Sequence, residues 1–331
     1  MKVLVTGGHG FLGSHLINSL LREGFEVTAV CRRPNPTLTA RGVHVIVADL
    51  ADPEATLPVC RGQEIVFHTA AKAGYWGAFR DYHHANVVAT QNILESCLTH
   101  GVRKLVHTST PSVVFDGHDI DGGNESLPYA SHPLTAYQKT KIAAEKLVLA
   151  AHGRNGLATV ALRPHIIWGN GDRHILPRLL QRARQGKLIQ VGDGRNQVSV
   201  IHVDDAARGH IQAALSSRAH GKAYFINHPK PVRFWHWIGR ILTAANLPRP
   251  HRTLNYHLAY ALGAICEMAF TALPGEPPMT RFLAAQLAKS HHFDISAAVR
   301  DFGFSPTVDP DTGITTLDFT QWLSPHSAST F

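Results

Sequence analysis

Cysteine is scarce in this sequence, with four residues at Cys31, Cys60, Cys97 and Cys266 in a chain of 331. They form no CxxC pair and no dense pattern, which excludes a disulfide scaffold and a cysteine-based zinc site. Histidine is plentiful, with 23 residues, but the chain has no HExxH motif. We therefore expect reduced thiols and no bound metal.

Long hydrophobic runs are also missing. The most apolar later stretch, residues 258–266, ends at Glu267 and is too short to span a bilayer, so we expect at most a peripheral contact with a membrane. The chain opens with MKVLVTGG, where a strand begins at once without the n-region and h-region of a signal peptide. These observations predict a cytoplasmic protein without a transmembrane segment.

Charged residues make up only 17% of the chain, although its formal net charge is +8. No block of Lys and Arg is long enough for a nucleic-acid-binding stripe. The spacing of Arg178, Arg182 and Arg184 is typical of the outer face of a helix. We expect no nucleic-acid partner, because a small ligand that bears phosphate groups would match the positive charge.

Short apolar, β-branched runs alternate with helical patterns in the first half of the chain. Each run is typical of a buried parallel strand. They lie at residues 2–6, 26–31, 43–47, 64–68, 104–108 and 158–163. After the first run, Leu12, Leu16 and Leu20 mark a helix that stops at Gly24. This alternation predicts an α/β fold with a doubly wound parallel sheet of the Rossmann type.

The regular alternation weakens after Arg163. Loops rich in Gly and Pro, such as residues 169–172 and 191–194, are followed by helices near the C-terminus. We predict a dinucleotide-binding domain at residues 1–163 and a smaller, mainly substrate-binding lobe at 164–331. Some segments of that lobe are expected to return to the first domain.

A three-glycine motif follows the first predicted strand and opens the first helix. Its sequence is TGGHGFLG, with glycines at Gly7, Gly10 and Gly13. Glycine permits a tight turn and a close approach of backbone N–H groups to a pyrophosphate, and the helix N-terminus adds partial positive charge. Such a motif is weak evidence by itself, but its position between strand and helix predicts a dinucleotide-binding loop.

The end of the second predicted strand indicates which dinucleotide binds. Arg32 and Arg33 follow Cys31, at the place where an acidic residue would hold the ribose 2′-hydroxyl of NAD. Arginine there favours NADP(H) over NAD(H), because its guanidinium can pair with the 2′-phosphate that only NADP(H) carries. Asp49, after the third strand, is placed to meet the adenine or, alternatively, to cap the following helix.

Tyr137 and Lys141 lie four residues apart on one face of a predicted helix. They follow the strand that leads into Thr108 and Thr110, where the carboxyl edge of the sheet would face a nicotinamide. The Lys141 ammonium is expected to lower the pKa of the Tyr137 phenol. Tyr137 would then give a proton to a carbonyl oxygen as hydride reaches the carbon, or accept it in reverse, while Thr110 hydrogen-bonds the same oxygen.

With these motifs the chain resembles the extended short-chain dehydrogenases over essentially its whole length, and within them the 3β-hydroxysteroid dehydrogenase-like group. Further signature stretches are HTAA at 68–71, NVVATQNIL at 86–94, LRP at 162–164 and IHVDDAA at 201–207. In that family a Ser or Thr, a Tyr and a Lys are catalytic, and an Asn helps a proton relay. The matching residues are Thr110, Tyr137, Lys141 and Asn86. The resemblance also implies cofactor contacts at Phe11, Leu12, Leu50, Ala70, Lys141 and Pro164.

Three shorter stretches narrow the resemblance: AAKAGYWG at 70–77, the Thr110-Pro111 step, and LPGEPPMTRF at 273–282. They are similar to the reductases that act on 2-alkyl-3-oxoalkanoates in bacterial olefin biosynthesis. The resemblance implies NADPH-dependent reduction of a hydrophobic 3-oxo acid to the 3-hydroxy acid. It also implies either a homodimer or an assembly with other enzymes of the pathway.

Three alternatives remain open. A 3β-hydroxysteroid or sterol-4α-carboxylate dehydrogenase would use the same residues on a fused-ring substrate. A sugar-nucleotide epimerase or dehydratase that keeps NAD bound needs polar groups for a diphosphate, whereas residues 258–270 are mostly apolar and predict either a core helix or a pocket wall. A redox-sensing binding module without turnover would be expected to lack Tyr137 or Lys141, and both are present.

Overall fold

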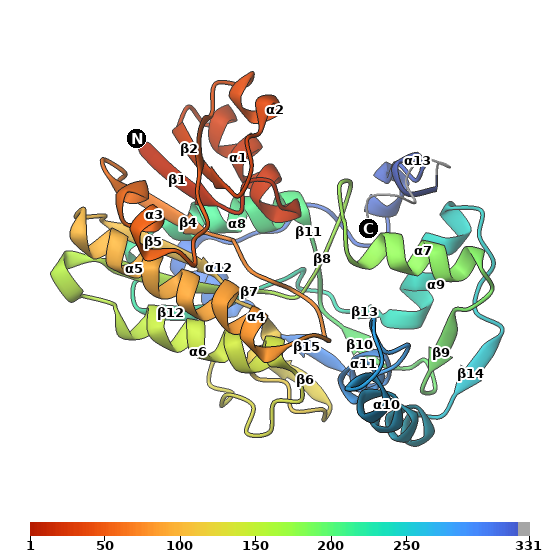
Figure 1. The fold of residues 1–331 in the computed structure, drawn as a ribbon. Helices are drawn as coiled ribbons and strands as arrows, with labels where there is room; N and C mark the ends of the chain where they lie inside the picture. The colour runs from red at the N-terminus through yellow and green to blue at the C-terminus, as the bar shows by residue number, and fades with distance from the viewer. Residues whose placement is uncertain (324–331) are drawn as a thin grey trace.

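The computed structural model describes residues 1–323 and contains a seven-stranded parallel sheet (Figure 1). The strand order is β12-β7-β5-β4-β1-β2-β3. The strands are β1 (Lys2–Thr6), β2 (Glu26–Cys31), β3 (His44–Val47), β4 (Ile65–His68), β5 (Lys104–Thr108), β7 (Ala158–Pro164) and β12 (Lys222–Ile226). The chain starts in the middle of the sheet and winds outward on both sides of β1, which leaves a ligand-binding crevice where the direction reverses. The predicted doubly wound fold of the Rossmann type is confirmed.

Helices cover both faces of this sheet. On one face, α1 (Phe11–Arg22) and α8 (Val203–Leu215) share a core with Val3 and Val5 of β1. On the other face, α5 (Ala89–Thr99) and α6 (Ala136–Ala150) share a core with Leu4 of the same strand. Successive side chains of a strand point to opposite faces. Because both faces are buried, the strands appear in the sequence as continuous apolar runs.

The six strands predicted from the sequence are all present, with bounds that differ by at most one residue. The pattern missed β12, which pairs in parallel with β7 along its whole length. The chain therefore leaves the sheet after Pro164, builds the first part of the second lobe, and returns through α8 to add a seventh strand. Helix α12 (Ser296–Phe302) also packs beside β12.

The second lobe lies beside the sheet and has its own core, which includes Trp168, Leu180, Trp237 and Ile241 (Figure 1). Its helices are α7 (Ile175–Arg184), α9 (Phe234–Ala244), α10 (Tyr256–Phe270), α11 (Arg281–Ala288) and α13 (Thr320–Leu323). Its short strands are β8 (Ile166–Trp168), β9 (Ile189–Val191), β10 (Gln197–Val198), β11 (Val200–His202), β13 (Val232–Arg233), β14 (Arg252–Leu254) and β15 (His291–Phe293). A four-stranded sheet in the order β13-β10-β15-β6 joins it to β6 (Ile120–Gly123) of the first half.

Short helices complete the first half of the chain. They are α2 (Pro36–Thr39), α3 (Pro53–Thr56) and α4 (Phe79–His83), which continues through a π-helical turn at His84–Val88 into α5. In residues 1–323 no helix combines the length and the apolar character needed to cross a bilayer.

The apolar stretch at 258–270 forms most of α10, but the interpretation of this stretch as a core helix is wrong. Ala259 and Gly263 are its two buried residues, while larger side chains such as Leu258 and Ile265 are exposed. The packing of α10 therefore depends on a narrow face of small residues, and much of the rest of the helix is exposed.

Candidate active site

The turn between β1 and α1 has the geometry of a dinucleotide-binding loop. Gly7 has φ +69°, a left-handed conformation that favours glycine. A Cβ on Gly13 would lie 2.3 Å from the Gly7 carbonyl oxygen, and a Cβ on Gly7 would lie 2.9 Å from the backbone of Ala70. Gly10 caps α1, and its N–H donates to the Gly7 carbonyl at 2.8 Å. The loop thus leaves a cradle without side chains at the N-terminus of α1, which suits a pyrophosphate.

The two residues that open α1 fix the helix beside this loop. Leu12 is buried in the core below the loop. Phe11 packs edge-on against His15, with ring centroids 5.6 Å apart. The predicted contact of both residues with a cofactor remains a prediction, and the structure places both next to the glycine cradle.

The arginines that suggested NADP(H) are exposed directly after β2, the strand that pairs with β1. Arg32 and Arg33 therefore lie at the same carboxyl edge of the sheet as the glycine loop. Asp49 lies past the end of β3, and its carboxylate accepts a hydrogen bond from Ala51 N at 3.0 Å. The next helix is capped by Asp52, so the alternative role of Asp49 as its cap is wrong.

The other predicted cofactor contacts also lie at this edge. Leu50 is buried just after Asp49. Ala70 follows β4, and its N–H donates to Thr6 Oγ1 at 3.2 Å. Pro164 is the last residue of β7 and is buried. Because parallel strands end at a common edge, residues far apart in the sequence line one crevice.

Tyr137 lies in the first turn of α6, and a capping box fixes this turn. Thr135 Oγ1 accepts from Gln138 N at 3.1 Å, and Gln138 Oε1 accepts from Thr135 N at 3.3 Å. A side-chain hydrogen bond joins the phenol of Tyr137 to Thr110. The structure therefore brings together the two hydroxyl groups that the sequence assigned to one substrate oxygen.

The protonation state of Tyr137 differs from the expectation. Burial raises the pKa of Tyr137, and the hydrogen bond with Thr110 lowers it only in part. The prediction that Lys141 lowers this pKa is wrong for this structure, because Lys141 Nζ donates to the Thr108 carbonyl at 2.6 Å. Tyr137 is thus a protonated donor at neutral pH, which suits the direction of ketone reduction.

Lys141 is buried next to two histidines that the motif did not reveal. Its Nζ lies 3.4 Å from His107 Nε2, and burial lowers the pKa of Lys141 to about 8. Burial also lowers the pKa of His107, and that of His68 to about 3. Both rings are therefore neutral, and the ammonium carries the charge of this cluster. His68 and His107 face each other on the paired strands β4 and β5.

Asn86 is buried in the π-helical turn between α4 and α5, and such turns are frequent at functional sites. Its Oδ1 accepts from Lys72 N at 2.7 Å, and its Nδ2 donates to Lys72 O at 3.1 Å and to Thr140 Oγ1 at 3.0 Å. Asn86 therefore ties the loop after β4 to the helix of Tyr137 and Lys141. Its role in a proton relay remains a prediction.

Other polar groups near the pair were not predicted as site residues. Thr110 Oγ1 donates to Ser112 Oγ at 3.3 Å. Glu145 forms a buried ion pair with Arg163, with distances of 2.5 and 3.1 Å. This pair links α6 to β7 and so positions the helix that carries Tyr137. Glu145 follows Lys141 by four residues, but only the fold brings Arg163 to it.

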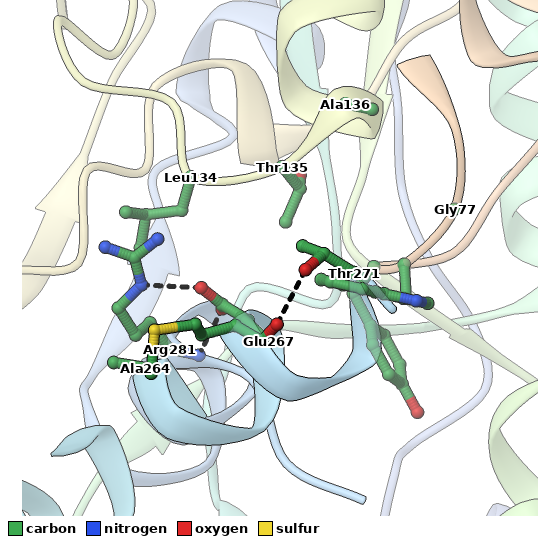
Figure 2. Close-up of a pocket in the computed structure, with 11 residues that line it drawn as sticks. Gly77, Leu134, Thr135, Ala136, Ala264, Glu267, Thr271 and Arg281 are labelled. Atoms are coloured by element: carbon green, nitrogen blue, oxygen red, sulfur yellow. Dashed lines mark hydrogen bonds and ion pairs between the residues drawn. The ribbon is translucent and has the colours of Figure 1, made fainter. Parts of the chain in front are cut away.

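A cavity of about 460 Å³ lies beside the start of α6 (Figure 2). It is lined by Tyr75, Trp76, Gly77, Leu134, Thr135, Ala136, Ala264, Glu267, Met268, Thr271 and Arg281. Figure 2 shows Glu267 and Arg281 directed toward each other. Glu267 accepts from Arg281 Nε at 2.7 Å and from Arg281 N at 2.8 Å. The C-terminal half of α10 thus forms one wall of the cavity, and the loop after β4 forms another.

Within residues 1–323 no group of three or more His, Cys, Asp or Glu side chains is arranged to hold a metal ion. The structure places Thr110, Tyr137 and Lys141 on the strand end and helix that follow β5, and the glycine cradle lies at the same carboxyl edge of the parallel sheet. This combination defines an extended short-chain dehydrogenase. The chain belongs to the 3-beta hydroxysteroid dehydrogenase/isomerase family, whose profile matches residues 4–257, and it is an NAD(P)-dependent oxidoreductase.

Two relatives and one solved structure illustrate the range of this likeness. The chain is 45% identical to the 2-alkyl-3-oxoalkanoate reductase of Stenotrophomonas maltophilia (strain K279a), over 96% of this chain and 98% of the relative. It is 34% identical to the mouse sterol-4-alpha-carboxylate 3-dehydrogenase, decarboxylating, over 95% and 89%. The structure of MoeE5 in complex with UDP-glucose and NAD superposes with a TM-score of 0.73 at 27% identity, over 96% and 97%.

Proposed function

We propose that this protein reduces the ketone of a 2-alkyl-3-oxoalkanoate to the 3-hydroxy acid with NADPH. The observation that carries the proposal is the cavity beside the start of α6, whose walls combine apolar side chains with the ion pair of Arg281 and Glu267. A 3-oxo acid with alkyl arms has the same two features, an apolar body and a carboxylate. The full-length likeness to a reductase named for such a substrate supports the same assignment.

The residues of the site fit the nicotinamide cofactor, because the glycine loop leaves a cradle that a Cβ at Gly7 or Gly13 would fill. When bound, the cofactor supplies a hydride to C3 of the substrate and is oxidised. Tyr137 gives its phenolic proton to the ketone oxygen, so that the C3 carbonyl becomes a secondary alcohol. Thr110 donates to the same oxygen as negative charge develops. Lys141, whose Nζ donates to the Thr108 carbonyl and lies beside His107, supplies the positive charge of the buried cluster next to this pair.

Arg281 is the cation that we assign to the substrate carboxylate. Its Nε and backbone N are occupied by Glu267, and in the described part of the chain neither of its Nη groups has a hydrogen-bond partner. Glu267 therefore fixes the orientation of the guanidinium. The two free Nη groups can each donate one N–H to a carboxylate in the paired geometry that arginine favours. The sequence alone did not identify this residue.

NADPH is proposed as the reductant because Arg32 and Arg33 follow β2 at the place where NAD-selective folds carry an acid. Both side chains are exposed at the edge that carries the glycine loop. A guanidinium there can pair with the 2′-phosphate that distinguishes NADP(H) from NAD(H).

A side-by-side assay of three substrates tests the proposal. The purified protein is incubated with a 2-alkyl-3-oxoalkanoate and NADPH, with a sterol-4α-carboxylate and NADP or NAD, and with a UDP-sugar. We expect NADPH consumption and formation of the 3-hydroxy acid with the first substrate. A preference for the sterol would support the same mechanism with a sterol carboxylate as the substrate. Conversion of the UDP-sugar alone, without net change in the cofactor, would identify an epimerase, and no turnover of any substrate would favour a binding module.

A further inference from the structure

Three histidines are buried near the ammonium of Lys141, and they differ in how their ring nitrogens are satisfied. They are His68 on β4, His107 on β5 and His210 on α8, and each is at most 1% exposed. Buried polar atoms are normally hydrogen-bonded, because a donor or acceptor without a partner is unfavourable in the interior. The partners of each ring therefore indicate what the fold uses that histidine for.

His68 is satisfied at both ring nitrogens by neutral groups. Thr90 Oγ1 donates to the Asn86 carbonyl at 2.6 Å. His68 Nε2 therefore donates to Thr90 Oγ1 at 3.0 Å, and its Nδ1 accepts from Thr6 Oγ1 at 2.8 Å. This ring has no acceptor left for a cation.

His210 is also satisfied at both ring nitrogens. Its Nδ1 donates to the Ala206 carbonyl at 2.7 Å, and its Nε2 accepts from Thr108 Oγ1 at 2.8 Å. These two bonds join α8 to the end of β5. The roles of His68 and His210 in the interior are therefore structural.

His107 differs from both, because its ring has Lys141 as its one polar partner within residues 1–323. Lys141 Nζ lies 3.4 Å from His107 Nε2. An ammonium can only donate, so Nε2 accepts and the ring proton is on Nδ1. This Nδ1 is buried without a hydrogen-bond partner in the described part of the chain. The fold thus keeps a buried N–H group without a partner, and the same ring provides an acceptor for Lys141.

The surroundings of Lys141 show why this acceptor matters. Its Nζ also donates to the Thr108 carbonyl at 2.6 Å, so two of its three N–H groups are engaged. Burial lowers the pKa of Lys141 to about 8, and the charge of Glu145 on the same helix acts against this effect. Tyr137 and His68 are uncharged near neutral pH. A neutral acceptor in direct contact stabilises the ammonium without bringing a second charge into the interior.

We propose that His107 is a positioning residue for the reaction, whose Nε2 fixes the direction of the Lys141 ammonium. With Thr108 as the second acceptor, this contact leaves one N–H group of Lys141 free to bind a ligand. The contact also favours the charged form of Lys141 over the neutral amine. The importance of this charge for turnover rests on the proposed function, whereas the contact between the two side chains does not.

A pH titration of the lysine side chains tests the proposal without a substrate. The protein is labelled with ¹³C at the Cε atoms of lysine and observed by NMR, and the Lys141 signal is identified by its absence from Lys141→Met. His107→Phe keeps a ring and removes the acceptor, so the titration midpoint of Lys141 should fall by about one pH unit or more, roughly a tenfold change in the protonation equilibrium. In His107→Gln the side-chain oxygen can accept in place of Nε2, so the midpoint should remain at about 8.

Lys104 is an internal control in the same spectra. It lies on β5, the strand that carries His107, and burial also lowers its pKa to about 8. Its Nζ donates to the carbonyl oxygens of Ala213 and Ser216, at 2.7 and 2.5 Å. Because these partners do not involve His107, the Lys104 midpoint should be the same in every variant.

Denaturant unfolding of the same variants distinguishes positioning from packing. His107→Phe removes the N–H group that has no partner, so this variant should be at least as stable as the unmodified protein. An unchanged Lys141 midpoint in His107→Phe would overturn the proposal, and so would a midpoint that falls equally in His107→Gln. If His107→Phe does not fold, His107→Leu, which also lacks an acceptor, takes its place in the titration.

The inference and the proposed function can fail separately. If the protein reduces 2-alkyl-3-oxoalkanoates, the fall in rate above about pH 8 should move in His107→Phe to lower pH, by the same amount as the Lys141 midpoint. A shifted midpoint in a protein that does not turn over this substrate would support the role of His107 and refute the proposed function. Turnover by a protein whose midpoint does not shift would refute the role of His107 and support the proposed function.

Discussion

Tyr137 is the residue on which the proposed chemistry depends most directly. Its phenol is protonated, because burial raises its pKa, and it is hydrogen-bonded to Thr110. Tyr137→Phe removes the proton donor and retains the ring, so turnover should fall at least ~100-fold, the range for a lost acid–base group. Cofactor affinity should be unchanged. Steady-state rates and a cofactor titration of the same preparation check both expectations, and turnover within a few-fold of the unmodified enzyme would refute the role of Tyr137.

The charge on Lys141 predicts the pH dependence of the reaction. Burial lowers the pKa of Lys141 to about 8, so the ammonium is present below this pH and is lost above it. The raised pKa of Tyr137 keeps the phenol protonated in the same range, and His68, with a pKa of about 3, stays neutral. The rate of reduction at saturating substrate should therefore be level near neutral pH and fall as the pH rises past about 8. A rate that increases through this range would contradict the assignment.

Arg32 predicts the choice of cofactor. If its guanidinium pairs with the 2′-phosphate, Arg32→Ala should weaken NADPH binding by roughly 10-fold or more, on the order of the ~1.5–3 kcal/mol of a charge-assisted hydrogen bond. NADH binding should change little, because NADH lacks this phosphate. Titration of both reduced cofactors against the variant provides the comparison. Tighter binding of NADH by the unmodified protein would remove the basis for this role of Arg32.

At the scale of elements, the turn between β1 and α1 is the part of the fold least tolerant of change. A Cβ at position 13 would lie 2.3 Å from a backbone oxygen, which cannot move aside as a flexible side chain can. Gly13→Ala should therefore widen the turn and weaken cofactor binding at least ~10-fold, with a loss of stability of ~1–3 kcal/mol. Gly239→Ala is the matched control, because its Cβ would meet the side chain of Arg249 no closer than 3.4 Å. Cofactor titration and denaturant unfolding of both variants distinguish a local effect from a general one.

The sequence predicted the elements whose signals are local. Six strands and the first helix follow from continuous apolar runs and from the glycines that end them. The strand β12 was missed, because part of the second lobe separates it in sequence from β7, the strand with which it pairs. The exposure of α10 was also not predictable from its composition, since periodicity alone does not show whether a short apolar helix is buried.

The residues of the candidate site also fall into two groups, those that local sequence signals predicted and those that only the fold brings together. Tyr137 and Lys141 are four residues apart, and Thr110 follows a strand end, so short-range spacing was enough to place them together. The direction of the Tyr137 pKa depends on burial and on the engagement of Lys141 with Thr108, and neither is visible in the sequence. The buried pair of Glu145 and Arg163 joins elements that only the fold makes neighbours.

At the scale of the whole molecule, we assign the chemistry to the first lobe and substrate recognition mainly to the second. The first supplies the glycine cradle and the proton donor, and the second closes the cavity with α10 and the start of α11. The proposed substrate would therefore reach both lobes at once. Its ketone would lie at Tyr137, and its alkyl arms would lie against the wall that α10 provides.

This division predicts how the rate depends on the length of the alkyl arms. Each buried methylene contributes about 0.8 kcal/mol, so kcat/KM should rise up to roughly fourfold for each added carbon if the contact persists in the transition state. The increase should stop once the arms fill the cavity of about 460 Å³ beside the start of α6. Arg281→Met should lower kcat/KM for every member of the series by a similar factor, because the carboxylate is common to all of them, and should leave the gain per carbon unchanged. The measurement is kcat/KM for a homologous series of 2-alkyl-3-oxoalkanoates, kept below the concentrations at which they form micelles. A flat series would show that the arms do not enter the cavity, and an Arg281→Met effect that varies with chain length would place the carboxylate elsewhere.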